Sequence, residues 1–156
     1  MTRCDLRVGM IGLGALGLPM AANLRRADVP MRVHTRSRSA ERDKSLQGSI
    51  VCATPSEAAE GVDVLLVCVS DNAAVEAVLF GADGACNQLT AGSVVVDCST
   101  IAPATAIACA QRLAQRGIHY LDAPVTGGTE GAKACLLYTS DAADEGLGVD
   151  LGGRRI

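Results

Sequence analysis

Three glycines near the start of the chain have the spacing of a dinucleotide-binding loop. Gly12, Gly14 and Gly17 form G-x-G-x-x-G in the stretch VGMIGLGALGLPM, directly after an apolar run and directly before a helix-favouring one. The first glycine of such a loop permits a tight turn, the second lets the backbone approach a pyrophosphate, and the third lets the helix pack on the strand. The phosphates then lie at the helix N-terminus, where free N–H groups and the helix dipole favour an anion. Glycines also gather in ordinary turns, but this position between a strand and a helix favours cofactor binding. The predicted site includes the residues between the glycines: Leu13, Ala15 and Leu16.

The end of the second predicted strand bears on the choice between NAD and NADP. In an NAD site, an acidic residue about 20 positions after the glycines binds the ribose 2′-hydroxyl. The stretch RVHTRSRSAERDK has no acid before Glu41. Its first hydroxyl and guanidinium groups belong to Thr35, Arg36, Ser37 and Arg38. Such groups suit a 2′-phosphate, so NADP is the expected cofactor and NAD the less favoured one. A charged loop after a strand can also be merely solvated.

The elements that position these residues alternate along the chain. The strand-like runs are RVGMIGL, MRVHT, SIVCA, DVLLVCVS, SVVVDCS and HYLDAPV. The helix-favouring runs between them are LPMAANLRRA, SAERDKSL, TPSEAAEG, NAAVEAVLF and APATAIACAQRLAQRG. Thr54 and Pro55 mark the start of one helix, and Gly61 and Gly117 stand where helices are expected to end. The alternation predicts an α/β fold, a Rossmann-type doubly wound parallel sheet with helices on both faces.

Composition argues against several classes of function. A chain of 156 residues with 49% hydrophobic and 20% charged residues is typical of one globular domain. The net charge of −3, with no cluster of Lys and Arg, argues against nucleic-acid binding. No apolar run reaches the length of a membrane span, and the N-terminus MTRCDLRVGM is charged where a secretory signal is apolar, so a cytoplasmic location is expected. The seven cysteines show no Cys-x-x-Cys pair and are expected to be reduced core residues rather than metal ligands.

Four stretches together resemble one enzyme family. In order and spacing, IGLGALGLPMAANL, VSDNAAV, VDCSTIAP and LDAPVTGGTEGA are similar to the β-hydroxyacid dehydrogenases, which include 3-hydroxyisobutyrate dehydrogenase and tartronate semialdehyde reductase (2-hydroxy-3-oxopropionate reductase). The resemblance covers Arg7 to about Ala134, and Leu16 replaces the methionine usual in the glycine loop. It implies hydride transfer between a nicotinamide cofactor and a short 3-hydroxy acid or its aldehyde or ketone partner. The implied partners are this small molecule and, for the parent enzyme, further copies of itself.

The resemblance also implies roles near the nicotinamide. Val69 and Ser70 occupy the place of a Leu-Pro pair beside the nicotinamide end of the cofactor. Thr100 matches a threonine whose hydroxyl lies near the nicotinamide ribose. Thr100 could instead, or in addition, cap the helix expected to begin near Pro103.

A third implied group binds the substrate. Thr126, Gly127 and Gly128 match a Ser-Gly-Gly segment that holds the substrate carboxylate through a hydroxyl and backbone N–H groups, with Thr126 as the substrate-positioning residue. A glycine pair after a strand can also be only a turn. The preceding Asp-Ala-Pro-Val favours the substrate role.

The proton of the reaction is handled in the family by a lysine of a second, all-helical domain. The lysines of this chain are Lys44 and Lys133, and neither stands in that motif. The chain is therefore expected to stop before the last strands of the sheet and the second domain, and to be inactive by itself. Two alternatives to an active dehydrogenase remain: a non-catalytic NADP-binding sensor or partner-binding module, and an imine reductase. The carboxylate-binding segment argues against both.

The end of the chain departs from the family. After Ala134 the sequence CLLYTSDAADE resembles the frame translation of a transposase sequencing adaptor, and VDLGGRRI continues the same adaptor in register after an index sequence. We therefore expect residues 1–134 to form an incomplete NAD(P)-binding domain. Residues 135–156 are expected to be an artefactual tail rather than a domain.

Truncation after Ala134 is expected to leave the melting temperature essentially unchanged. An adaptor-encoded segment has not been selected to pack on this core, and the stretch DAADEGLGVDLGGRR is polar and glycine-rich. Thermal denaturation of the full and truncated chains compares the two directly. A large fall in melting temperature on truncation would count against the adaptor assignment.

Overall fold

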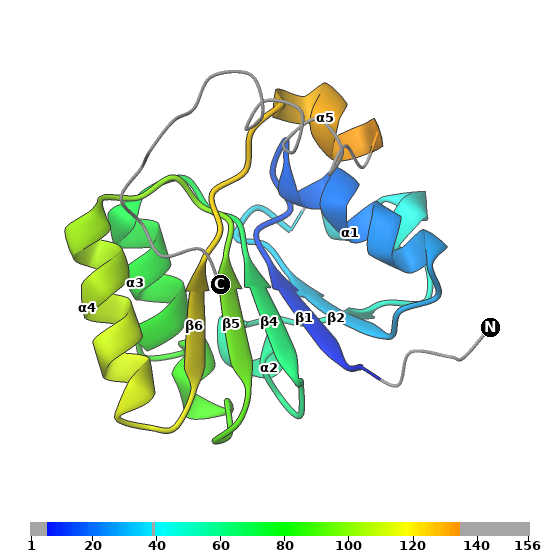
Figure 1. The fold of residues 1–156 in the computed structure, drawn as a ribbon. Helices are drawn as coiled ribbons and strands as arrows, with labels where there is room; N and C mark the ends of the chain where they lie inside the picture. Colours follow the sequence, from blue (N-terminus) through cyan, green and yellow to red (C-terminus); the bar gives the residue numbers. More distant parts are fainter. Residues whose placement is uncertain (1–5, 39, 135–156) are drawn as a thin grey trace.

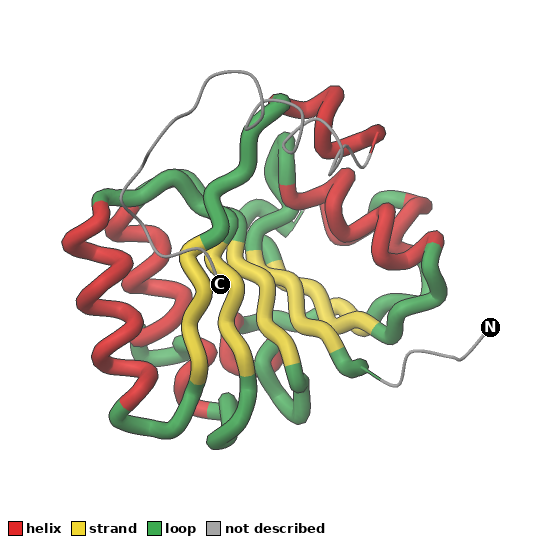
Figure 2. Tube along the Cα trace, viewed as in Figure 1, coloured by secondary structure: helices red, strands yellow, loops and turns green. Residues whose placement is uncertain are grey.

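The protein is a single parallel sheet flanked by helices. The computed structural model describes residues 6–38 and 40–134. The strands are β1 Val8–Ile11, β2 Met31–His34, β3 Ile50–Val51, β4 Val64–Val67, β5 Val94–Asp97 and β6 His119–Asp122. All neighbouring strands pair in parallel, in the order β3-β2-β1-β4-β5-β6 (Figure 2). This confirms the doubly wound fold expected from the alternation of runs.

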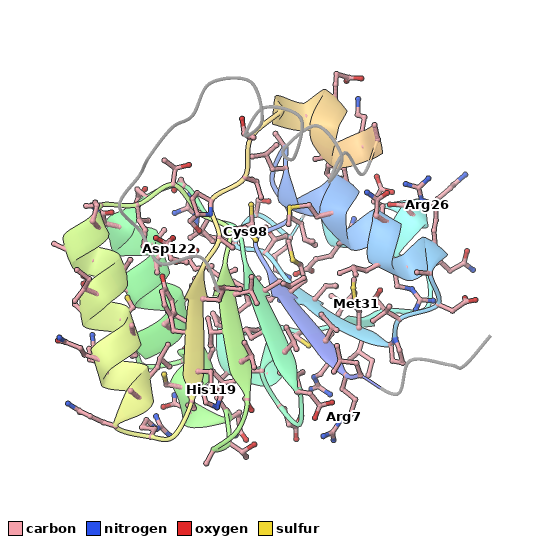
Figure 3. All side chains as sticks on the ribbon, in the orientation of Figure 1. Arg7, Arg26, Met31, Cys98, His119 and Asp122 are labelled. Carbon is pink, nitrogen blue, oxygen red and sulfur yellow. The ribbon has the colours of Figure 1, made fainter. Side chains whose placement is uncertain are left out.

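The strand order reverses at β1. From β1 the chain passes outward to β2 and β3, and then returns to place β4 on the other side of β1. Loops that leave two neighbouring strands in opposite directions open a crevice between them at the carboxyl ends of the strands. Cys98 and Asp122 lie at this end of β5 and β6 in Figure 3, whereas Arg7 and His119 lie at the opposite end of the sheet.

Helices cover the two faces of the sheet unequally. They are α1 Gly17–Arg26, α2 Pro55–Ala58, α3 Asn72–Phe80, α4 Pro103–Ala114 and α5 Gly128–Ala134. Side chains of α2, α3 and α4 share one buried cluster, which includes Ile11 and Leu65. A second cluster joins α1 to Met10 and Met31 on the other face, where α1 and α5 lie together (Figure 1). Met10 and Ile11 fall in different clusters because successive strand residues point to opposite faces.

The face that carries α1 is less covered over β4 to β6. Leu66, Val96 and Leu121 are register partners on this face. Leu66 and Val96 are only half-buried, and Leu121 is 44% exposed. The expectation of helices on both faces therefore holds fully at β1, where all residues are buried, and weakens toward β6 within the described part of the chain.

The helices begin and end close to where the sequence predicts, but α4 lacks the side-chain cap suggested for it. The Thr54 side chain accepts a hydrogen bond from the Glu57 N–H, and Pro55 is the first residue of α2, as expected. Gly61 and Gly117 have positive φ angles of 65° and 71°, which confirms them as residues that end helices. The alternative that Thr100 caps α4 is wrong, because Ala102 is the residue before the helix and no side chain caps it.

The run SAERDKSL forms two short 3₁₀ turns, Ala40–Arg42 and Lys44–Leu46, rather than one helix. Asp43 between them has an extended backbone, and its side chain accepts a hydrogen bond from the Ser45 N–H at 2.8 Å. An Asp side chain that binds a nearby backbone N–H competes with helix formation, which explains the interruption.

The described residues contain five free cysteines, of which four are buried: Cys52, Cys86, Cys98 and Cys109. Burial raises the pKa of the Cys98 thiol to about 11, so this side chain stays neutral. No helix in the described part of the chain is both long and apolar enough to cross a membrane.

Candidate cofactor site

A hollow of about 490 Å³ opens at the carboxyl ends of β1, β2 and β4, in the crevice where the strand order reverses. Three segments expected from the sequence meet there: the glycine loop, the residues after β2 and the residues after β4. The predicted residues that line the hollow are Gly12, Gly14, Ala15, Leu16, Gly17, Thr35, Arg36, Ser37, Val69 and Ser70. The fold thus brings together most of the predicted cofactor residues, from positions far apart in the sequence.

The three glycines of the loop differ in what surrounds them. Gly12 has φ of 95°, and a Cβ added to it would collide with the carbonyl oxygen of Cys68. A Cβ on Gly17 would collide with the carbonyl oxygen of Gly12. A Cβ on Gly14 would meet nothing within 4 Å. The fold itself therefore requires the first and third glycines, whereas the second leaves an open cradle of the kind that a pyrophosphate fills.

The N-terminus of α1 faces this cradle. The residue before the helix is Leu16, whose side chain cannot accept a hydrogen bond from the first turn. The Leu18 N–H donates to the Gly14 carbonyl at 3.1 Å, so the loop leads directly into the helix. Because the first turn of a helix leaves N–H groups without intrahelical partners, this end of α1 can bind an anion.

Glu41, the first acid after β2, does not line the hollow. Its carboxylate accepts a hydrogen bond from the Thr35 N–H at 3.3 Å and pairs with the Arg38 guanidinium at 2.8 Å. The Glu41 side chain is only 4% exposed, and neither Glu41 nor Arg38 lines the hollow. Arg36 does line it. The arginine at the hollow is therefore not the one that pairs with the buried acid.

Arg36 faces acidic and hydroxyl groups that follow β4. The Ser70 hydroxyl donates to Asp71 at 2.7 Å, and the Ala74 N–H donates to the same carboxylate at 2.8 Å. These hydrogen bonds lower the pKa of Asp71, and the positive charge of Arg36 adds to the effect. Asp71 also caps α3, so the same side chain connects the residues after β4 to the start of that helix.

Six further residues that line the hollow were not predicted from the sequence: Ile11, His34, Cys68, Ala74, Ala77 and Val78. The last three belong to α3 and have the spacing i, i+3, i+4, which places them on one face of the helix. Small side chains at this spacing, in the helix after β4, are the signal that could have identified them. The other three lie at or next to the ends of β1, β2 and β4.

Two of the predicted cofactor residues do not line the hollow. Leu13 points into the core beneath α1 and is 4% exposed. It follows Gly12, where the chain turns, and an apolar side chain at the turn packs inward. Thr100 is exposed in the loop between β5 and α4. The residue before it, Ser99, connects to the hollow instead: its Oγ accepts a hydrogen bond from the Val69 N–H at 3.0 Å.

The predicted substrate segment follows β6 and leads into α5. Thr126, Gly127 and Gly128 are exposed, and both glycines have positive φ, 93° and 60°. α5 packs on α1, and the Asn23 side chain donates to the Ala132 carbonyl at 2.8 Å. The segment therefore lies at the same end of the sheet as the glycine loop (Figure 1), although it does not line the hollow.

Comparisons with known proteins agree with this geometry. Residues 7–145 match the model of the NAD-binding domain of 6-phosphogluconate dehydrogenase. The matched range passes Ala134, the domain end expected from the sequence. The tail proposed for residues 135–156 lies outside the described residues and stays a prediction.

The relatives include the enzymes named by the resemblance. The 2-hydroxy-3-oxopropionate reductase of Escherichia coli K12 is 37% identical over 91% of this chain and 48% of that protein. A 3-hydroxyisobutyrate dehydrogenase from Salmonella typhimurium is 33% identical with a TM-score of 0.76, over 83% of this chain and 45% of that one. Psf3 in complex with NADP+ and 2-OPP is 38% identical with a TM-score of 0.76, over 81% and 45%.

An imine reductase from a Pseudomonas species is more distant, 26% identical with a TM-score of 0.72 over 81% of this chain and 43% of that one. The chain spans about half the length of the curated relatives it matches. Because the family model matches most of its residues, the chain belongs to the NAD-binding domain family of 6-phosphogluconate dehydrogenase.

Proposed function

We propose that the chain binds NADP in the hollow and is the cofactor domain of a dehydrogenase that acts on a short 3-hydroxy acid or the matching semialdehyde. The observation that carries the proposal is the contrast among the three loop glycines. Two are enclosed by backbone, and the middle one opens onto the N-terminus of α1. The fold has no need of a glycine at Gly14, whereas a bound pyrophosphate does.

The preference for NADP rests on the residues after β2. The Arg36 guanidinium at the hollow matches the geometry of a 2′-phosphate. Glu41, the first acid after β2, pairs with Arg38 and the Thr35 N–H and does not line the hollow, so it does not repel that phosphate there. Thr35 and Ser37 contribute the neighbouring backbone and hydroxyl groups. The relative bound to NADP+ supports the same choice.

The proposed reaction requires a site for the cofactor and a site for the substrate. When bound, the nicotinamide supplies or accepts the hydride. The chain's own residues bind and orient: the glycine loop holds the pyrophosphate, and Thr126 with the backbone of Gly127 and Gly128 holds the substrate carboxylate. Both glycines are exposed and have positive φ, a backbone conformation that residues with a side chain rarely adopt. The proposed substrates are tartronate semialdehyde or 3-hydroxyisobutyrate and their partners, because the relatives carry these names.

Two alternatives keep the same cofactor site and differ in the chemistry. A sensor or partner-binding module would bind NADP without turnover, and an imine reductase would reduce a carbon–nitrogen double bond. The segment Thr126–Gly128 favours the hydroxy-acid enzyme over both, because a carboxylate-binding segment has no role in either alternative.

Alanine substitutions at Gly14 and Gly17 separate cofactor binding from folding. Gly14→Ala is expected to leave the melting temperature nearly unchanged and to weaken NADPH binding at least about tenfold, because the new Cβ enters the phosphate cradle. Gly17→Ala is expected to destabilise the fold by about 1–3 kcal/mol, because its Cβ meets the Gly12 carbonyl. Thermal denaturation and NADPH fluorescence titration measure the two effects. An unchanged NADPH affinity in Gly14→Ala would contradict the cradle.

Arg36→Ala is expected to remove most of the preference for NADP and to leave NAD binding nearly unaltered. Hydrogen bonds to charged groups contribute roughly 1.5–3 kcal/mol, which corresponds to about 10- to 100-fold tighter binding of NADP than of NAD. The matched control is Arg42→Ala, which removes an exposed arginine of the same segment that does not line the hollow. Calorimetric titration of both cofactors against the three proteins decides the point. Equal affinities in the unmutated chain, or an Arg36→Ala variant that still prefers NADP, would show that the phosphate lies elsewhere.

The polypeptide of 156 residues is expected to bind NADPH without oxidising it. Lys133 is paired with Glu130 at 3.0 Å on α5, and Lys44 lies in a 3₁₀ turn, so neither is placed as the general acid. Loss of a positioned general acid typically costs about 10²–10⁴ in rate. Absorbance at the NADPH band, with tartronate semialdehyde present, measures turnover. A measurable rate by the pure chain would overturn this expectation.

A further inference from the structure

A chain of hydrogen bonds runs from β6, through the buried Asp97 and Ser99, to the loop after β4. The Tyr120 hydroxyl donates to Asp97 Oδ2 at 2.8 Å, and the Ser99 N–H donates to Asp97 Oδ1 at 2.9 Å. The Ser99 Oγ then accepts the Val69 N–H at 3.0 Å. We call Tyr120, Asp97 and Ser99 the Asp97 chain. It connects β6, through Asp97 at the end of β5, to the loop that follows β4.

The hydrogen bonds of the Asp97 chain are costly to break because Asp97 and Ser99 are buried. Asp97 is fully buried and Ser99 is 2% exposed. A buried carboxylate is costly unless its oxygens accept hydrogen bonds, and each Asp97 oxygen accepts one. Burial raises the pKa of Tyr120, and the hydrogen bond to Asp97 raises it further, so the phenol stays protonated and continues to donate. Removing either donor would leave an acceptor unsatisfied in a low-dielectric interior.

The Asp97 chain ends at the backbone N–H of Val69, and Val69 lines the hollow. Regular pairing of β4 with β5 ends at Val67 and Asp97, and the Cys98 N–H still donates to the Val67 carbonyl. At the next position along the loop, the Val69 N–H meets the Ser99 side chain in place of a backbone carbonyl. The direction in which Val69 and Ser70 leave the sheet is therefore set by a side-chain oxygen that the Asp97 chain holds.

The place of this loop indicates which half of the cofactor it serves. In a doubly wound sheet, the end of β2 receives the adenosine ribose, and the dinucleotide extends across the crevice over β1 toward β4 and β5. Arg36 marks the β2 side of the hollow, and Val69 with Ser70 marks the β4 side. The two ends of the hollow can therefore be disturbed separately.

We propose that Tyr120, Asp97 and Ser99 are positioning residues that hold the Val69–Ser70 backbone for the nicotinamide half of the cofactor. None of the three lines the hollow, so they act through Val69 rather than by contact with the cofactor. The inference rests on the proposed cofactor site and goes beyond it, because it assigns a role to buried groups on β5 and β6.

The test compares two ligands on the variants Ser99→Ala and Tyr120→Phe. NADP+ carries both halves of the cofactor, whereas adenosine 2′,5′-bisphosphate carries the adenosine and the 2′-phosphate without the nicotinamide. Each variant is expected to bind NADP+ about 5- to 50-fold more weakly, the effect of one buried hydrogen bond lost. Each is expected to bind the bisphosphate with unchanged affinity. Calorimetric titration of the full chain measures all of these values.

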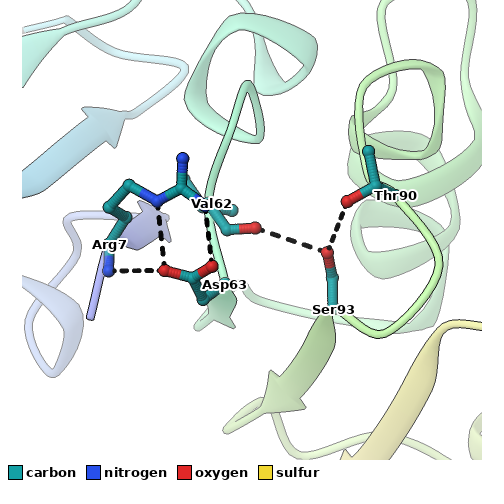
Figure 4. A network of polar contacts seen from close by, with 5 residues as sticks. All are labelled: Arg7, Val62, Asp63, Thr90 and Ser93. Carbon is teal, nitrogen blue, oxygen red and sulfur yellow. Dashed lines mark hydrogen bonds and ion pairs between the residues drawn. The ribbon is translucent and has the colours of Figure 1, made fainter. Parts of the chain in front are cut away.

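Ser93→Ala is the matched control. Ser93 precedes β5 at the opposite end of the sheet and is 4% exposed. Its hydroxyl lies 3.3 Å from the Val62 carbonyl and 3.4 Å from Thr90 Oγ, close to the ion pair of Arg7 with Asp63 (Figure 4). This substitution also removes a buried serine hydroxyl, so it is expected to lower the melting temperature. It is expected to leave both ligand affinities unchanged.

The outcomes separate the positioning role from a general structural one. Equal losses for both ligands in Ser99→Ala and Tyr120→Phe would overturn the proposal, and so would no loss for either ligand. Tyr120→Phe, which removes a single oxygen atom, gives the answer if Ser99→Ala does not fold. An unmutated chain that binds neither ligand would overturn the proposed cofactor site and this inference with it. An unmutated chain that binds both, alongside variants that bind equally well, would overturn only the inference.

Discussion

Close contact between the glycine loop and the backbone around it is the constraint on which the site depends. At Gly12 the loop passes so near the Cys68 carbonyl that no side chain fits, and at Gly17 the helix begins equally near the Gly12 carbonyl. These contacts bring the ends of β1 and β4 together and place the first residue of α1 at the hollow. Gly14 lies between the two close contacts in the sequence, and a Cβ added to it would meet nothing within 4 Å.

The ion pair between Arg38 and Glu41 decides which charged side chain after β2 is left at the hollow. The segment after His34 carries several basic and acidic groups, yet the fold buries Glu41, pairs it with the half-exposed Arg38 and places Arg36 at the hollow. A buried carboxylate needs partners, and Arg38 with the Thr35 N–H supplies them. The positive φ of Arg38, 59°, is the backbone conformation that accompanies this inward turn.

The two sides of the crevice are built differently. On the β2 side, the hollow is lined by the exposed side chains of Arg36 and Ser37, so binding there depends on side chains. On the β4 side, buried hydrogen bonds through Asp97 connect β6 to the loop that lines the hollow. The exposed segment at Thr126 follows β6, the strand that carries Tyr120.

The order of the elements, the glycine loop and most of the residues at the hollow could be predicted from the sequence alone. These are local properties: alternating apolar runs, glycine spacing and helix caps such as Thr54 depend on neighbours along the chain. Four features became visible only in the folded chain: Glu41 is buried, Thr100 does not cap α4, three residues of α3 line the hollow, and the Ser99 side chain accepts a hydrogen bond from the Val69 N–H. Each of these depends on contacts between segments far apart in sequence or on the competition of several partners for one group. Spacing along the chain carries no information about that competition, because burial and the directions of side chains arise only when the strands are assembled.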